Sequence, residues 1–185
     1  IDVGGPFSNY EVRKNLTTNE LAPNAYVTGP LISTYLPPNL DKKDPPIIKV
    51  SNEEEARELV RKQVPYKPDF IKIWYIVLPG QPAAKTLPIV KATIEESHKN
   101  NLKVAVHATE YETAKLAVEA GCDILVHSID DKPADAAFLQ LLKSKNITTV
   151  LIGSSSVEQL KNNIKCIDNT GFTQTEIDSI EEILG

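Results

Sequence analysis

The stretch DFIKIWYIV, residues 69–77, places a lysine, Lys72, in the middle of an apolar run. A short run rich in β-branched and aromatic residues predicts a buried strand. Charged side chains are rarely buried without a partner, so this strand raises the question of what Lys72 faces.

Strand-like and helix-like segments alternate outward from this stretch. Strands are expected at 25–33, 69–77, 102–108, 122–128 and 146–153, and helices at 51–64, 87–100, 110–120, after Pro133 and at 173–184. This alternation is typical of βαβ units and a parallel sheet. No GxGxxG or GxxxxGK loop follows any strand, and polar residues recur near the strand ends. The pattern therefore favours a TIM barrel over an open doubly wound sheet.

The first of these helices carries a recognisable start signal. Ser51 and Glu54 have the spacing of a capping box, which predicts that Ser51 caps the helix. Ala56, Leu59 and Val60 then lie on one face at helical spacing, so this face is expected to be buried.

Composition excludes several classes of protein. The 185 residues fit one domain, and 41% hydrophobic content is typical of a globular chain. A net charge of −5 argues against a nucleic-acid partner, and no apolar run is long enough for a membrane span. Cys122 and Cys166 have no metal-binding or redox spacing. Because the chain begins with Ile1 and has no methionine, we expect it to be part of a longer protein.

Lys72, His107 and His127 interrupt three successive apolar strands. If those strands are neighbours in a barrel, the three side chains converge at one mouth. Histidine is a common metal ligand, and a lysine becomes one when its amine captures carbon dioxide as a carbamate. Taken singly, each residue also has a structural explanation, so the pattern alone leaves a shared metal site and separate structural roles open. His98 is expected to be structural, near a helix end.

The blocks FIKI (70–73), VAVHA (104–108) and ILVHS (124–128) occur in this order with a helix between each pair. Together they resemble the metal-dependent amidohydrolase superfamily, and within it the imidazolonepropionase-related group with its prolidase-like members. IDVGGP (1–6) and AYVTGP (25–30) resemble the ends of that family's second and third barrel strands. The resemblance implies an α/β fold in which residues 1–185 form an incomplete TIM (β/α)8 barrel, from about strand two to strand seven.

The resemblance also implies a site and a reaction. Lys72 matches the carboxylated lysine that bridges the metals, and His107 and His127 match the ligands on strands five and six. The expected cofactor is a divalent metal, zinc in the first place, as one ion or two. A metal-bound hydroxide would hydrolyse an amide-type C–N bond in a cyclic amide or a dipeptide, Xaa-Pro included. Tyr75 is expected near the substrate, or else as a packed aromatic of the barrel wall.

The chain departs from the family pattern in three ways. It has no His-x-His pair, no convincing strand-eight aspartate after residue 155 and no β-sandwich segment. The alternatives are a lactonase or phosphotriesterase that uses the same site, and a non-catalytic scaffold or binding protein with a degraded site. The expected partner is a small-molecule substrate, with no nucleic acid and no membrane. A homo-oligomer and the cellular compartment stay open.

Overall fold

The computed structural model describes residues 1–22, 24–127, 129–144, 157–158, 161 and 173–175. Within these residues, five short strands form one parallel sheet in the order β2-β1-β3-β4-β5. The strands are β1 (Leu31–Ser33), β2 (Ile47–Lys49), β3 (Ile71–Trp74), β4 (Val104–His107) and β5 (Ile124–Val126). An isolated parallel bridge also joins Asp2 to Val27, before β1.

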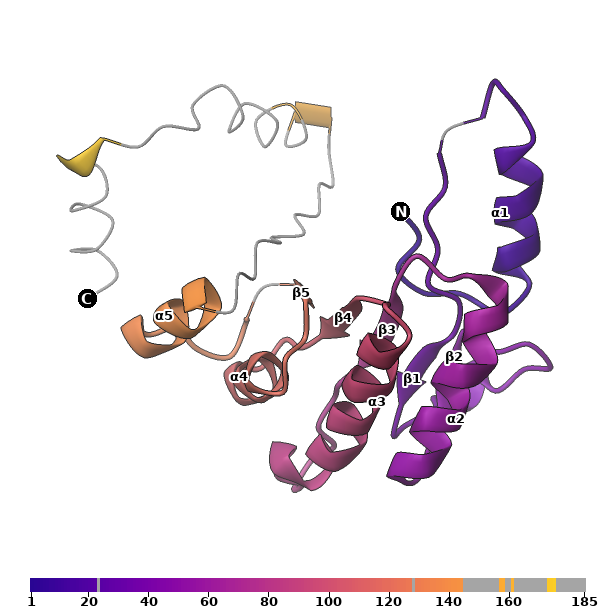
Figure 1. Ribbon diagram of the computed structural model, residues 1–185. Helices are drawn as coiled ribbons and strands as arrows, with labels where there is room; N and C mark the ends of the chain where they lie inside the picture. Colours follow the sequence, from indigo (N-terminus) through magenta and orange to yellow (C-terminus); the bar gives the residue numbers. More distant parts are fainter. Residues whose placement is uncertain (23, 128, 145–156, 159–160, 162–172, 176–185) are drawn as a thin grey trace.

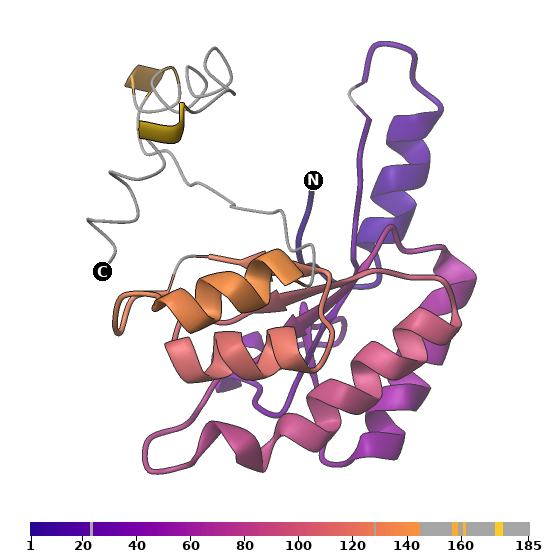
Figure 2. The ribbon, with the colours of Figure 1, turned by 60° about the vertical axis from the view of Figure 1, so that its left-hand side comes forward.

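Helices connect most of these strands. The helices are α1 (Asn9–Thr17), α2 (Glu53–Gln63), α3 (Leu87–Lys99), α4 (Tyr111–Glu119) and α5 (Ala136–Ser144), with the 3-10 turns η1 (Pro38–Leu40), η2 (Val64–Tyr66) and η3 (Ala83–Lys85). Helices α2, α3 and α4 follow β2, β3 and β4 in turn and lie along the same face of the sheet (Figure 1). Helix α1 projects away from the sheet in both views (Figures 1 and 2). In the described part of the chain, no helix is long and apolar enough to cross a membrane.

The core lies between this sheet face and the helices. Successive side chains of a strand point to opposite faces, so alternate residues of β3 and β4 share the core. The buried cluster contains the strand residues Ile32, Ile71, Ile73, Val104 and Val106, and the helix residues Ala56, Leu59, Val60, Val90, Ile94, Tyr111, Ala114, Ala117, Val118 and Phe138. By the same alternation, Lys72 and Trp74 of β3 and His107 of β4 belong to the opposite face. The chemistry-bearing residues are therefore separated from the core by the sheet itself.

The parallel α/β fold that the sequence predicts is confirmed. A strand order of 2-1-3-4-5 also occurs in doubly wound sheets, but those sheets carry helices on both faces. Here α2, α3 and α4 pack on one face, as the outer helices of a TIM barrel do. A complete barrel is not shown. The strand predicted at 146–153 lies outside the described residues, as does the helix predicted at 173–184 beyond residue 175.

The strand predicted at 25–33 is interrupted. Val27 takes part in the isolated bridge, Gly29 has a φ of +68°, and β1 begins only at Leu31. A Cβ on Gly29 would collide with the ring of Tyr10, which comes from α1. A left-handed backbone and a close ring together require glycine at this position. Helix α1, which was not predicted, has Tyr10 as its only buried residue.

The predicted capping box of α2 is wrong by one residue. Asn52, not Ser51, caps the helix, and its side-chain oxygen accepts a hydrogen bond from the Glu55 N–H at 2.9 Å. The Glu55 carboxylate in turn accepts from the Ser51 N–H at 2.7 Å. The Asn52 side-chain amide also donates to the Glu55 carboxylate at 2.8 Å, so the reciprocal pair is Asn52 and Glu55 rather than Ser51 and Glu54. The prediction that Ala56, Leu59 and Val60 are buried is confirmed.

Candidate metal centre

Three neighbouring strands carry the predicted site residues, Lys72 within β3 and the two histidines at the carboxyl ends of β4 and β5. In the register, Lys72 lies opposite Ala105, Trp74 opposite His107, and His107 opposite Val126. His127 is the first residue after β5. Since the strands are parallel, their carboxyl ends meet at the same edge, where α/β folds place their chemistry.

Lys72 is buried and its amine has no partner. The side chain is 2% exposed, and in the described part of the chain its Nζ is the one buried side-chain nitrogen or oxygen without a hydrogen bond. Burial lowers the pKa of this amine from its usual 10.5 to about 7. An unpaired ammonium in such a place is costly, so the neutral amine, with a free lone pair, is strongly populated near neutral pH.

The two imidazoles lie against each other beside Lys72. The ring centroids of His107 and His127 are 4.6 Å apart, and the ring planes make an angle of 75°. Burial, then the neighbouring His127 and Lys72, lower the pKa of His107 to about 4. Burial and Lys72 also lower the pKa of His127. Both rings are therefore neutral at pH 7, which is the form that binds a metal ion.

His127 has an unusual backbone. Its φ is +77°, in the left-handed region that side chains other than glycine rarely adopt. This conformation costs free energy, and such strain clusters at functional sites. The turn directly after β5 places the imidazole beside His107, although Val126 is the residue that pairs with His107 in the sheet.

The donor set fits a metal ion only in part. Two neutral imidazoles and an amine that can become a carbamate are suitable ligands for zinc. No group of three or more His, Cys, Asp and Glu side chains that could hold a metal occurs among the described residues. In the same residues neither imidazole has a hydrogen bond to orient its second nitrogen, a contact that metal-bound histidines usually have.

Two aromatic residues that the sequence reasoning missed extend this cluster. The Trp74 ring lies 6.1 Å from the His107 ring, and the Tyr35 ring lies 6.2 Å from the Trp74 ring. Trp74 could have been found from the period of the strand, because it is two residues after Lys72 and so shares its face. Tyr35 follows β1 in a loop and carried no such signal.

The other candidates lie elsewhere. Tyr75 is in the core cluster on the helix side, and its hydroxyl donates to the Ala83 carbonyl at 2.7 Å. The structure does not bring it to Lys72, and its contact with substrate stays a prediction. His98, in the last turn of α3, lies 2.9 Å from an Asp123 carboxylate oxygen, as a residue with a structural role would.

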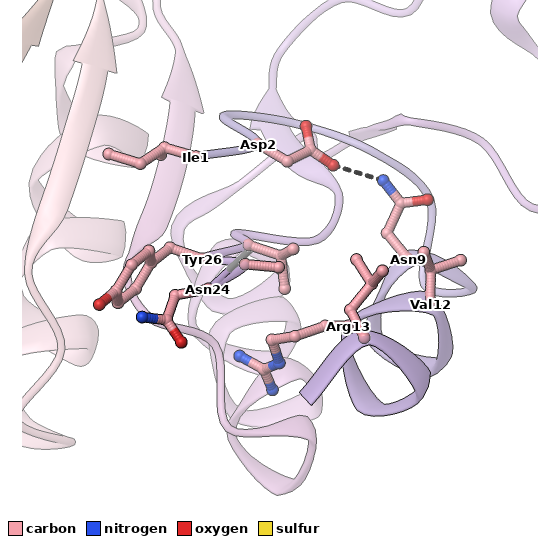
Figure 3. A pocket seen from close by; sticks show the side chains of 10 residues that line it. Ile1, Asp2, Asn9, Val12, Arg13, Asn24 and Tyr26 are labelled. Carbon is pink, nitrogen blue, oxygen red and sulfur yellow. Dashed lines mark hydrogen bonds between the residues drawn. The ribbon is translucent and has the colours of Figure 1, made fainter. Parts of the chain in front are cut away.

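A hollow of about 380 Å³ lies at the other end of the sheet, beside α1 (Figure 3). The Val27 N–H that borders it bonds to Asp69, which precedes β3, so the hollow is near the amino ends of the strands. Among its polar side chains, Asp2 pairs with Asn9 and Arg13 pairs with Asp69, whereas those of Asn24 and Tyr26 have no hydrogen bond within the described residues. The hollow holds no group of three or more His, Cys, Asp and Glu side chains, as in the rest of the described chain.

Comparisons with known proteins identify the fold. No family model and no curated protein matches the sequence. Several solved structures do match the chain. A putative prolidase from Bifidobacterium longum is 22% identical with a TM-score of 0.59, over 77% of this chain and 34% of that one. A Xaa-Pro dipeptidase with bound methionine is 23% identical with a TM-score of 0.62, over 78% and 39%. The ochratoxinase of A. niger is 20% identical with a TM-score of 0.59, over 77% and 39%.

These likenesses show a shared fold with prolidase-like and amidohydrolase structures over about three quarters of this chain. The chain spans only about a third to two fifths of the length of the structures that it matches.

Proposed function

We propose that this chain belongs to a metal-dependent hydrolase of amide-type C–N bonds, with Lys72, His107 and His127 as the residues that hold the metal. The observation that carries the proposal is the buried, unpartnered Lys72 amine beside two neutral imidazoles. The three residues come from neighbouring parallel strands: Lys72 lies within β3, His107 ends β4, and His127 directly follows β5. The activity is proposed for the whole protein, of which this chain supplies one part of the site.

Lys72 would act as a carbamate. Its neutral amine attacks carbon dioxide, a bond forms between Nζ and carbon, and the nitrogen releases one proton to solvent. The product carries two carboxylate-like oxygens in place of an ammonium. Burial supports this step, because it favours the neutral amine that can react.

His107 and His127 would supply neutral nitrogen ligands from two adjacent strands. Their lowered pKa values keep protons from competing for these nitrogens at pH 7. A bound divalent ion, zinc in the first place and as one ion or two, would polarise the scissile carbonyl and activate water for attack. A catalytic zinc usually has three protein ligands, and the carbamate would be the third here.

The substrate is proposed to be a dipeptide, Xaa-Pro included, or a cyclic amide. Support comes from the similar structures, two of which are described as a prolidase and a Xaa-Pro dipeptidase. A lactonase or phosphotriesterase would use the same residues, so ester, lactone and phosphotriester substrates belong in the same assay.

A non-catalytic scaffold or binding protein is the second candidate. The specific observation in its favour is the short donor set, because the described residues offer no carboxylate beside the two imidazoles. In that case Lys72 would stay an amine and the protein would bind no metal.

The test is the zinc content of the full-length protein after dialysis against zinc and bicarbonate. Lys72→Ala should lose most of the bound metal and the hydrolysis of Xaa-Pro dipeptides. It should keep or raise the melting temperature, because it removes a buried amine without a partner. Lys103→Ala is the matched control, since Lys103 is exposed one residue before β4.

Equal zinc content in Lys72→Ala and the parent would contradict the bridging role. A parent protein that binds no zinc with or without bicarbonate would favour the scaffold. Zinc binding with hydrolysis of lactones or phosphotriesters but not of amides would keep the metal site and change the substrate class.

A further inference from the structure

Four rings form a continuous row along the carboxyl ends of the strands. Tyr35 follows β1, Trp74 ends β3, His107 ends β4 and His127 follows β5. The centroid distances along the row are 6.2 Å, 6.1 Å and 4.6 Å. The two imidazoles belong to the proposed metal site, but Tyr35 and Trp74 have no role in it.

The Tyr35 end of the row is fixed by Ser33. Its hydroxyl donates to the Trp74 carbonyl at 3.0 Å and accepts from the Tyr35 N–H at 3.2 Å. Ser33 is itself 3% exposed, so this link is protected from water. One buried hydroxyl thus ties the loop that carries Tyr35 to the end of the strand that carries Trp74. The backbone segments that carry the two rings are therefore connected before any ligand arrives.

Both rings keep free surface and free polar atoms. Each is half-buried. Within the described residues, no cation lies over either ring, and neither the Tyr35 hydroxyl nor the Trp74 indole N–H has a hydrogen-bond partner. Neither polar atom is among the buried atoms without a partner, so both are accessible from solvent. The two residues therefore offer an apolar surface with two accessible donors.

We propose that Tyr35 and Trp74 form the substrate-recognition wall of this site, and that they select amides bearing an aromatic or pyrrolidine ring next to the scissile bond. This inference rests on the proposed function and names its substrate class. The ring of the substrate packs on the two aromatic faces, and its carbonyl or carboxylate oxygen accepts from the free donors. The reacting bond then lies toward His107, the next ring along the row.

Binding can be measured without turnover, because Trp74 is the only tryptophan in these 185 residues. The probes are N-acetyl-L-phenylalaninamide and N-acetyl-L-prolinamide, with N-acetyl-L-alaninamide as the ringless control. We expect a saturable blue shift of tryptophan emission with the two ring-bearing probes only. The shift should be absent from Trp74→Phe, which identifies its source if the full-length protein has other tryptophans.

Variants of Tyr35 separate recognition from packing. Tyr35→Leu should weaken the binding of both ring-bearing probes by roughly tenfold, and Tyr35→Phe should restore most of it, because aromatic contacts reach about this size. Tyr26→Leu is the control, since Tyr26 is 49% exposed and lies beside the hollow at the other end of the sheet. In turnover, Tyr35→Leu should raise KM for ring-bearing amides and leave kcat within about twofold.

Equal shifts with all three probes, or unchanged binding in Tyr35→Leu, would overturn the recognition wall. Hydrolysis that does not prefer ring-bearing amides would overturn it too, while the proposed hydrolase stands. Selective binding of the ring-bearing probes without any hydrolysis would uphold the wall and overturn the hydrolase.

Discussion

His127 combines a strained backbone with a proposed ligand, so stability and function should oppose each other there. At a φ of +77° a residue with a Cβ is disfavoured, and glycine is not. His127→Gly should therefore raise the free energy of unfolding by about 1 kcal/mol and abolish metal binding. Urea unfolding and zinc content measure the two effects.

The same substitution at His107 is the control. His107 lies in β4 and has no positive φ, so glycine there should lower the free energy of unfolding by about 1 kcal/mol. Metal binding should be lost in this variant as well. A loss of stability in both variants would mean that the backbone at His127 carries no strain.

Tyr10 should make the protein sensitive to alkaline pH. Its hydroxyl donates to the Thr28 carbonyl at 2.8 Å, and burial is the main reason that its pKa is raised well above 10.0. The folded state keeps a proton that the unfolded state loses above pH 10. The stability that Tyr10 contributes is therefore present below pH 10 and is lost as pH rises above it.

Tyr10→Phe tests this by urea unfolding between pH 8 and about 11. At pH 8 the variant should lose about 1–3 kcal/mol, because the Thr28 carbonyl and the Gln63 side chain lose a partner. Its stability should then fall less steeply above pH 10 than that of the parent. Tyr26→Phe, at an exposed position, should follow the parent curve; a parallel fall in Tyr10→Phe would place the alkaline sensitivity elsewhere.

The two-residue period of side chains along a strand explains which site residues could be predicted. Lys72, His107 and His127 stood out because each interrupts an apolar strand, and the structure brings the two imidazoles together beside the lysine. Tyr75 is three residues after Lys72, an odd spacing that turns a side chain to the opposite face. The left-handed turn at His127 could not be predicted, because nothing in the residue type demands it.

Helix α2 begins with a side-chain cap whose contribution can be measured. Asn52→Ala removes the side chain that accepts the Glu55 N–H and should cost about 1 kcal/mol of unfolding free energy. Ser51→Ala should change it by less than about 0.5 kcal/mol, because the Ser51 hydroxyl has no partner in the described part of the chain. Urea unfolding of both variants measures these changes in unfolding free energy. Equal losses in the two variants would show that Ser51 and Asn52 contribute equally to the cap.

Helices and strands could be predicted where apolar residues recur at a regular spacing, whereas the residues at which they begin and end could not. The predicted segments at 69–77, 102–108 and 122–128 contain β3, β4 and β5, but each strand is shorter than its apolar run. Tyr75, Ala108 and Cys122 lie beyond the strand ends and belong to the buried core, so burial rather than strand pairing accounts for their apolar character. Ser51 and Asn52 are both residue types that cap helices, so the sequence alone does not decide between them. The hydrogen bond from the Glu55 N–H identifies Asn52 as the cap.

Within the described residues, the sheet has two outer strands, β2 and β5. The parallel fold followed from alternating strands and helices. The same local pattern does not predict a closed barrel, because closure depends on pairing between strands that lie far apart in the sequence. The single helix-covered face is what relates this sheet to a barrel wall, and it leaves the opposite face to the site.

Hydrogen exchange should report these edges. The amides of β3 and β4 lie between two strands each and should exchange slowest, with free energies of opening close to that of global unfolding. β2 and β5 have one neighbouring strand each in the described residues, so their amides should exchange faster, by at least about tenfold. Mass spectrometry of peptides from the four strands in the full-length protein measures this order.

If the amides of β5 are protected as strongly as those of β3, the free edge of β5 pairs with a further strand. The candidate metal centre beside His127 then lies in the interior of a longer sheet. Protein dilution separates the two sources of such a strand, because protection that falls with concentration comes from a second copy of the chain.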